Sequence, residues 1–190
     1  MKRISFARFT ISSLLLALLF VALATSAARR PRYGGTLTID LQGRATSLDP
    51  AQKQGTFADQ IAQERLLRLV ADRLINIGQF GRAEPALAIS WQHDDKFTRW
   101  KFHLRLDVKF QDATLLTPQL VADSLQAIDP SWRVSATKDS MIVESDLPLP
   151  DLLYVLAETQ SSIVFRKPTG EIIGTGPFRL TTWESGKHAV

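Results

Sequence analysis

The feature that most constrains the fold of this chain is a strict alternation of apolar and polar residues after residue 99. The apolar positions are Trp100, Phe102, Leu104 and Leu106, and the polar ones are Lys101, His103 and Arg105. Successive side chains of a strand point to opposite faces, so the alternation predicts a β-strand with one buried and one solvated face. Asp94-Asp95-Lys96 just before it predicts a hairpin turn from a partner strand near residues 89–92. The chain must therefore build part of an antiparallel sheet.

Two helices are predicted from their start signals. Thr56 is a typical N-cap, and we expect a helix over residues 57–74. Its expected buried stripe consists of Ile61, Leu66, Val70 and Leu74. Thr117 followed by Pro118 predicts a second helix, because proline suits the first helical position. Val121, Leu125 and Ile128 give that helix an apolar stripe, and Asp129-Pro130 ends it.

Shorter segments complete the expected layout. Alternation predicts a strand over 36–41, and Leu48-Asp49-Pro50 indicates a turn within a loop over 45–54. We further expect a turn over 76–82, a short connector over 83–90, a hairpin over 134–145, a helix over 151–157, and strands over 163–165 and 178–183. Gly174-Thr175-Gly176 lacks the Lys-Ser or Lys-Thr pair of a phosphate loop, so it is interpreted as a tight backbone crossing. The pattern as a whole predicts a mixed α/β (α+β) domain.

The first 28 residues have the three parts of a secretory signal peptide. Lys2, Arg3 and Arg8 precede an apolar run over 14–24, and small residues follow. The alternative is a transmembrane anchor, but the apolar run is shorter than the roughly 20 residues that a spanning helix needs. We therefore expect cleavage after Ala27 or Ala28 and a periplasmic location for the exported chain.

Composition excludes several classes of function. The leader holds three of the 23 basic residues and no acidic one, so 20 basic residues face 19 acidic residues in the rest of the chain. That balance argues against nucleic-acid binding, which needs a broad basic face. The chain has no cysteine, which excludes disulfides, thiolate metal sites and a cysteine nucleophile.

No residue pattern indicates catalysis or a metal. His93, His103 and His188 lie far apart in sequence and form no zinc-binding motif. His103 is interpreted as a solvated or salt-bridged residue of the predicted strand, and the Asp94-Asp95 pair as part of a turn. The sequence therefore predicts no enzyme, no metal and no cofactor.

Three stretches in order resemble the family 5 extracellular solute-binding proteins, the oligopeptide, dipeptide and nickel group. The first runs over 34–39 and continues in Ser47-Leu48-Asp49-Pro50. The second runs over 87–125 and includes Phe102-His103-Leu104-Arg105 and Asp112-Ala113-Thr114, where the family usually has glycine at the middle position of the latter turn. The third runs over 174–180 and continues in Trp183-Glu184 and Gly186.

This resemblance implies a two-lobed clamp of the periplasmic-binding-protein type II-like fold, which captures a peptide or similar small solute without catalysis. Its partner would be the membrane permease of an ATP-binding cassette (ABC) transporter. Residues 29–190 would then be the N-terminal segment of lobe I, incomplete and without the second lobe. Closure of such a clamp is a hinge motion biased by contacts with the ligand.

The part of this segment expected to face the ligand is the loop after Pro50. We therefore expect Gln54, Gly55, Thr56 and Phe57 to be ligand-facing residues, the alternative being a loop and helix cap without a ligand role. Two other interpretations of the chain stay open: a short exported interaction domain, or a decayed gene product that does not bind ligand. The sequence leaves the identity of the solute undetermined.

Overall fold

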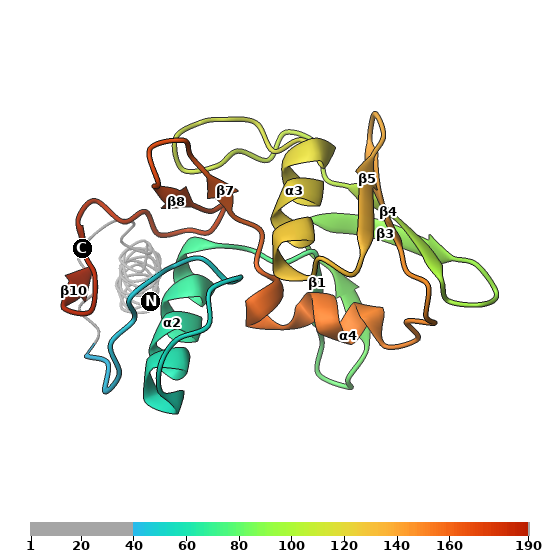
Figure 1. Ribbon diagram of the computed structural model, residues 1–190. Coiled ribbons are helices and arrows are strands. Elements are labelled where there is room, and N and C mark those ends of the chain that lie inside the picture. The colour runs from blue at the N-terminus through green and yellow to red at the C-terminus, as the bar shows by residue number, and fades with distance from the viewer. Residues whose placement is uncertain (1–39, 190) are drawn as a thin grey trace, which may run out of the picture. The chain divides into compact units, whose positions relative to one another are not determined.

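A computed structural model describes residues 40–189, with side chains through residue 187 (Figure 1). The expected signal peptide over 1–28 and all but the end of the expected strand over 36–41 lie outside the described residues. The described part is a mixed α/β domain, as the sequence predicts. Among its residues, no helix combines the length and apolar character needed to cross a lipid bilayer.

A four-stranded antiparallel sheet forms the centre of the described domain. It comprises β3 (Ala88–His93), β4 (Arg99–Leu104), β5 (Arg133–Ala136) and β6 (Ser140–Glu144), in the order β3-β4-β6-β5. The predicted hairpins 89–104 and 134–145 are both confirmed. The side chain of Asp94 closes the first turn by accepting hydrogen bonds from the N–H groups of Thr98 and Arg99.

One face of this sheet carries the main core. Trp100, Phe102 and Leu104 of β4 are buried, as predicted, together with Met141 and Val143 of β6. Helix α3 (Pro118–Ile128) packs against β5 and β6 with Val121 and Leu125 (Figure 1). Each of these two side chains is fully buried, which contributes about 1.5–3 kcal/mol. The predicted cap is confirmed, since Thr117 Oγ1 accepts a hydrogen bond from Leu120 N–H.

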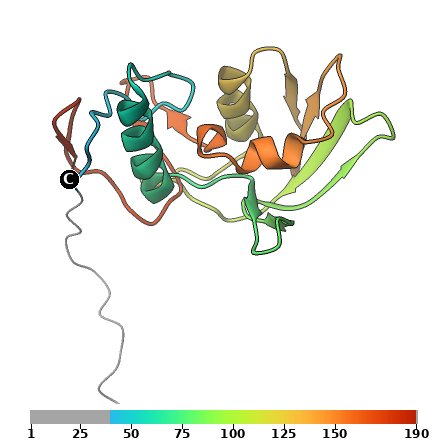
Figure 2. The same cartoon turned by 90° about the horizontal axis from the view of Figure 1, so that it is seen from below.

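The remaining elements are short. A hairpin of β1 (Ile75–Ile77) and β2 (Ala83–Pro85) packs against α4 (Leu152–Ala157), which a 3₁₀ turn (Thr159–Ser161) follows. Strand β2 replaces part of the connector expected over 83–90. Two further hairpins join β7 (Phe165–Arg166) with β8 (Ile172–Ile173), and β9 (Trp183–Glu184) with β10 (His188–Ala189). Figure 2 shows α2 (Phe57–Val70) beside the loop that precedes it.

The end of α2 differs from the prediction. The helix stops at Val70 rather than at residue 74, and Leu67 rather than Leu66 is its buried leucine. Its last carbonyls are bound by a distant segment, because Gly176 N–H donates to Val70 O and Phe178 N–H donates to Leu69 O. With these carbonyls already bound, the chain leaves the helix at Ala71, which has an extended backbone conformation. Leu74 then enters the core outside the helix.

Three other expectations about strands are wrong. Leu106 is 72% exposed, because β4 ends at Leu104 and Asp107 adopts a positive φ that redirects the chain. Only Trp183 of the expected strand over 178–183 lies in a strand, since backbone groups of Phe178 bind α2 and Gln111 instead of a neighbouring strand. The strand expected over 163–165 begins only at Phe165, because Ile163 N–H and Val164 N–H bind Asp72 O and the Ser124 hydroxyl.

Candidate functional site

The loop before α2 is fixed to the helix by one buried side chain. The amide of Gln63, on the second turn of α2, donates hydrogen bonds to the carbonyl oxygens of Ser47 (3.2 Å), Asp49 (2.9 Å) and Gln52 (3.2 Å). Gln63 is only 6% exposed. A buried amide with this many acceptors fixes the path of the loop backbone, because breaking the bonds would leave polar groups unsatisfied. Sequence reasoning missed Gln63, whose only signal was a polar residue on an otherwise apolar helix face.

Asp49 joins this loop to the β7–β8 hairpin. Its carboxylate accepts hydrogen bonds from Arg166, with Nε at 2.8 Å from Oδ2 and the terminal nitrogen at 2.6 Å from Oδ1. Ala51 N–H donates to the same carboxylate. Burial raises the pKa of Asp49, but the hydrogen bonds from Arg166 and Ala51 outweigh it, so the net pKa lies below its usual value. The Asp49-Pro50 turn is therefore an anchored, ionised junction between segments 117 residues apart.

The four residues predicted to face the ligand follow this anchored turn, and they differ in burial and in their hydrogen bonds. Gln54 is 6% exposed, and its Oε1 accepts hydrogen bonds from the backbone N–H and the hydroxyl of Thr46, at 2.9 and 2.7 Å. Gly55 is exposed, and Phe57 presents 77% of its surface to solvent at the first position of α2. The structure thus brings the four residues together at one end of α2, with the Gln54 side chain directed inward.

Thr56 forms a capping box with Asp59. Asp59 N–H donates to Thr56 Oγ1, and Thr56 N–H and its hydroxyl donate to Asp59 Oδ2. Arg44 N–H donates to the other carboxylate oxygen of Asp59. Hydrogen bonds from the Thr56 side chain and the Arg44 backbone lower the pKa of Asp59. The predicted N-cap is confirmed, and it holds the loop and helix start in one conformation.

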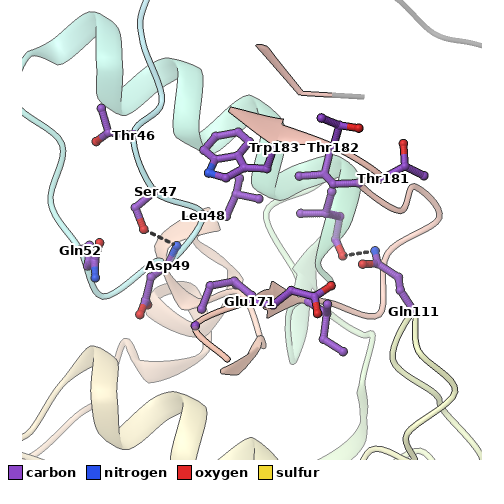
Figure 3. A pocket seen from close by; sticks show the side chains of 15 residues that line it. Thr46, Ser47, Leu48, Asp49, Gln52, Gln111, Glu171, Thr181, Thr182 and Trp183 are labelled. Carbon is purple, nitrogen blue, oxygen red and sulfur yellow. Dashed lines mark hydrogen bonds between the residues drawn. The ribbon is translucent and has the colours of Figure 1, made fainter. Parts of the chain in front are cut away.

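The Ser47–Asp49 turn lines a cavity of about 480 Å³ (Figure 3). Its wall combines the turn with residues of the β7–β8 hairpin and with Thr181, Thr182 and Trp183. Gln54, Gly55, Thr56 and Phe57 do not line it. The cavity is therefore lined by the anchored turn and not by the nominated residues that follow it.

The glycine motif over 174–176 is the backbone crossing that the sequence predicts. A Cβ on Gly174 would lie 2.0 Å from Val70 O, and one on Gly176 would lie 2.6 Å from Leu69 O. Gln111 joins the two crossing segments, since its side-chain amide donates to Val70 O at 2.9 Å and to Phe178 O at 2.5 Å. The motif has a packing role here, and its glycines make the close approach possible.

Lys167, Asp112 and Glu171 form an ionic cluster beside the β7–β8 hairpin. Lys167 Nζ lies 3.1 Å from Asp112 and 2.9 Å from Glu171. Hydrogen bonds from the Thr114 backbone and hydroxyl, together with Lys167, lower the pKa of Asp112 to about 2. The carboxylates of Glu171 and Asp112 raise the pKa of Lys167. The cluster connects the turn after Phe110 with the β7–β8 hairpin.

Ser140, His103 and Asp139 have the composition of a catalytic triad but not its hydrogen-bond pattern. Ser140 Oγ lies 2.9 Å from His103 Nδ1 and donates a hydrogen bond to Asp139 at 2.7 Å. The serine proton is thus held by the carboxylate rather than by the imidazole, and Ser140 is fully buried. A nucleophile needs an adjacent base to take its proton, which this arrangement does not provide. Among residues 40–187, no three His, Cys, Asp or Glu side chains are placed to bind a metal.

Comparison with known proteins identifies the family that this chain resembles. Residues 82–190 match the family described as bacterial extracellular solute-binding proteins, family 5 Middle. The chain is 26% identical to the peptide transport periplasmic protein SapA of Salmonella typhimurium, in an alignment that covers 95% of this chain and 42% of SapA.

Solved structures show the same fold. An ABC transporter substrate-binding protein from Sinorhizobium meliloti superposes with a TM-score of 0.64 at 22% identity, over 80% of this chain and 34% of that one. AgaA from A. tumefacien R10, solved in complex with agropinic acid, gives a TM-score of 0.64 at 23% identity, over 78% of this chain and 34% of that one. The oligopeptide ABC transporter substrate-binding domain from Bacillus anthracis gives 0.62 at 16% identity, over 75% and 34%.

These relatives are longer than the chain described here, which spans less than half of SapA and about a third of each of the three solved chains. The family match nevertheless includes more than half of this chain, from β2 to the last residue. The shared fold is of the periplasmic-binding-protein type II-like kind. The chain belongs to the bacterial extracellular solute-binding proteins of family 5.

Proposed function

We propose that this chain is part of lobe I of an exported substrate-binding component of an ABC-type importer, and that it captures peptides or similar small solutes without catalysis. Family membership and the match to a peptide transport protein support the proposal. The observation that carries it is the loop over 46–57, which Gln63 and the Asp49–Arg166 ion pair hold in one conformation. A loop fixed in this way can present groups to a ligand at little entropic cost.

The proposed contact residues are Gln54, Gly55, Thr56 and Phe57. The Gln54 amide and the Thr56 hydroxyl are engaged in internal hydrogen bonds. Gln54 and Gly55 would therefore act through their backbone groups, which suit the strand-like hydrogen bonding of a peptide. The N–H and carbonyl of Thr56 bind Asp59 and Gln60, so Thr56 would act by holding these groups in place. Phe57 would add an exposed ring for an apolar part of the solute.

The proposed cellular setting follows from the family. The leader over 1–28 would direct export to the periplasm and be cleaved after Ala27 or Ala28. The loaded protein would deliver its solute to a membrane permease of the ABC type. N-terminal mass determination of the exported product would test the cleavage, since a retained leader would indicate a membrane anchor instead.

Peptide capture is tested by titrating the purified full chain with trialanine in a calorimeter, with a mixture of tripeptides as competitor. We expect binding that Phe57→Ala weakens by about fivefold or more, because the ring supplies buried apolar contact. Phe80→Ala is the matched control, since Phe80 is 89% exposed but lies on the β1–β2 turn. Equal losses in both variants, or no binding of any tripeptide, would overturn the proposal.

The alternative function is that of a short exported interaction domain. Its signature would be a defined complex with another protein, formed equally well by the parent chain and by Phe57→Ala, without tripeptide binding. Purification of the exported chain from its own cells under mild conditions would distinguish the two functions.

A further inference from the structure

A second hollow, at the end of β4, has no part in the proposed function. It is a shallow groove of about 410 Å³, formed by β3, β4, the chain just after β4 and the β5–β6 turn. It shares no lining residue with the cavity beside the Ser47–Asp49 turn and contains none of the four nominated residues. Any ligand of this groove is therefore separable from a solute bound near Phe57.

The walls of the groove include two apolar side chains that the fold leaves uncovered. Ile89 of β3 is 51% exposed, and Leu106 is 72% exposed. Leu106 continues the buried alternation of β4 in the sequence, yet the positive φ of Asp107 turns the chain and leaves Leu106 in solvent. Ile89 and Leu106 therefore place two exposed branched apolar side chains at one hollow.

The charged side chain of the groove that makes no hydrogen bond or ion pair within the described residues is a cation, Arg105. Lys101, His103 and Arg105 follow at alternate positions, and His103 and Arg105 line the groove. The carboxylate of Asp139 also lines it, but the Ser140 hydroxyl binds that carboxylate, and His103 and Lys101 interact with its charge. Among residues 40–187, no hydrogen bond or ion pair engages the guanidinium of Arg105. The groove therefore offers one free cationic fork next to two apolar side chains.

We propose that this groove binds a carboxylate that carries a short apolar side chain, as found at the free C-terminus of an apolar peptide. The Arg105 guanidinium holds the carboxylate, since its planar fork matches the two oxygens. Ile89 and Leu106 pack against the apolar side chain. Because the groove is open to solvent and the ligand is small, the affinity lies on the order of millimolar.

The test is a titration of the purified full chain with N-acetyl-leucine, followed by saturation-transfer NMR of the ligand. N-acetyl-leucine amide is the matched probe without the charge, and we expect it to bind about fivefold more weakly or not at all. Arg105→Gln should reduce the binding of the acid to that of the amide. Leu106→Ser should weaken both probes, because it removes apolar contact.

Controls separate this site from folding and from solute capture. Arg82→Gln removes an exposed arginine on the β1–β2 turn and should leave binding unchanged, as should Phe57→Ala. Circular dichroism should show the parent fold in each variant. Equal binding of acid and amide, or full binding by Arg105→Gln, would overturn the proposal. Binding of octanoate without binding of N-acetyl-leucine would assign the groove to acyl chains and reject the peptide terminus.

Discussion

At the scale of single residues, Ala113 has a strained backbone conformation that the Asp112-Ala113-Thr114 motif does not reveal by itself. It occupies the middle of the Asp112-Ala113-Thr114 turn with φ at +70°, a left-handed conformation that disfavours residues with a Cβ. The turn is kept because Asp112 accepts a hydrogen bond from Thr114 N–H and because Phe110 and Thr114 are also bonded through their backbones. Alanine is therefore held in a conformation that glycine adopts without strain.

We predict that Ala113→Gly raises the free energy of unfolding by about 0.5–1 kcal/mol, because relief of strain exceeds the added entropy of the unfolded chain. Urea denaturation followed by tryptophan fluorescence measures this change. Ala127→Gly is the matched control, since Ala127 is exposed and helical in the last turn of α3, where the same substitution should lower stability by up to about 1 kcal/mol. A loss of stability at both positions would contradict the prediction.

The opposite substitution should be severe at Gly174. A Cβ there would lie 2.0 Å from Val70 O and 2.7 Å from Ala71 Cα, and both are backbone atoms that cannot rotate away. We predict that Gly174→Ala lowers the free energy of unfolding by about 3 kcal/mol or more. Gly170→Ala is the comparison, because a Cβ at Gly170 meets no atom within 4 Å and only its positive φ opposes the change. A smaller loss at Gly174 than at Gly170 would show that the crossing is not tight.

At the scale of elements, the two long helices begin as the sequence predicts but stop for different reasons. Each starts at a threonine whose hydroxyl binds a backbone N–H three residues on. Helix α3 ends at Ile128, just before Asp129-Pro130, where a local signal is present. Helix α2 ends where the distant Gly176–Phe178 segment binds its last carbonyls. Starts depend on local chemistry, whereas this end depends on a contact distant in sequence.

The cap of α3 gives a test at this scale. Thr117→Ala removes the acceptor of Leu120 N–H and should lower the free energy of unfolding by about 1 kcal/mol. Thr117→Ser keeps a hydroxyl at the same place and should retain most of the stability. Thermal unfolding of the two variants beside the parent chain measures the difference. Equal losses in both would mean that the methyl group of Thr117, rather than its hydroxyl, stabilises the helix start.

At the scale of the whole molecule, ionised carboxylates connect segments that are distant in sequence. Asp49 binds Arg166, and Asp112 binds Lys167. Both carboxyls have pKa values below their ordinary value, and that of Asp112 is about 2. A group with a lowered folded pKa stabilises the fold above its unfolded pKa, and that stabilisation is lost as pH falls through the folded value.

We therefore predict that the unfolding temperature falls between pH 5 and pH 2, and that the contribution of Asp112 is lost between its ordinary pKa of 3.8 and about 2. Asp112→Asn should lower the unfolding temperature at pH 6 and flatten the acid part of the profile. Asp95→Asn, a change at an exposed carboxylate on the β3–β4 turn, is the control and should leave the profile unchanged. Parallel acid profiles for the parent chain and Asp112→Asn would argue against this role of Asp112.

The sequence by itself determined the central hairpins, the starts of the two long helices and the family. Period-two alternation placed β4 and its hairpin partner, and the Thr117-Pro118 pair placed the start of α3, because both signals depend on neighbouring residues. The family resemblance, now confirmed, also came from motifs whose order along the chain is visible without a structure. The four nominated residues were found at one end of α2, and their role in binding stays a prediction.

Only the tertiary structure decided which polar residues hold the loop and where the apolar alternation stops. Gln63 and Arg166 act on Asp49 and its neighbours from positions 14 and 117 residues away, so no local pattern identifies them. Leu106 follows the alternation of β4 yet is exposed, because a single positive φ at Asp107 redirects the chain. Patterns in a sequence report which faces are apolar, whereas contacts between distant segments determine which of those faces are covered.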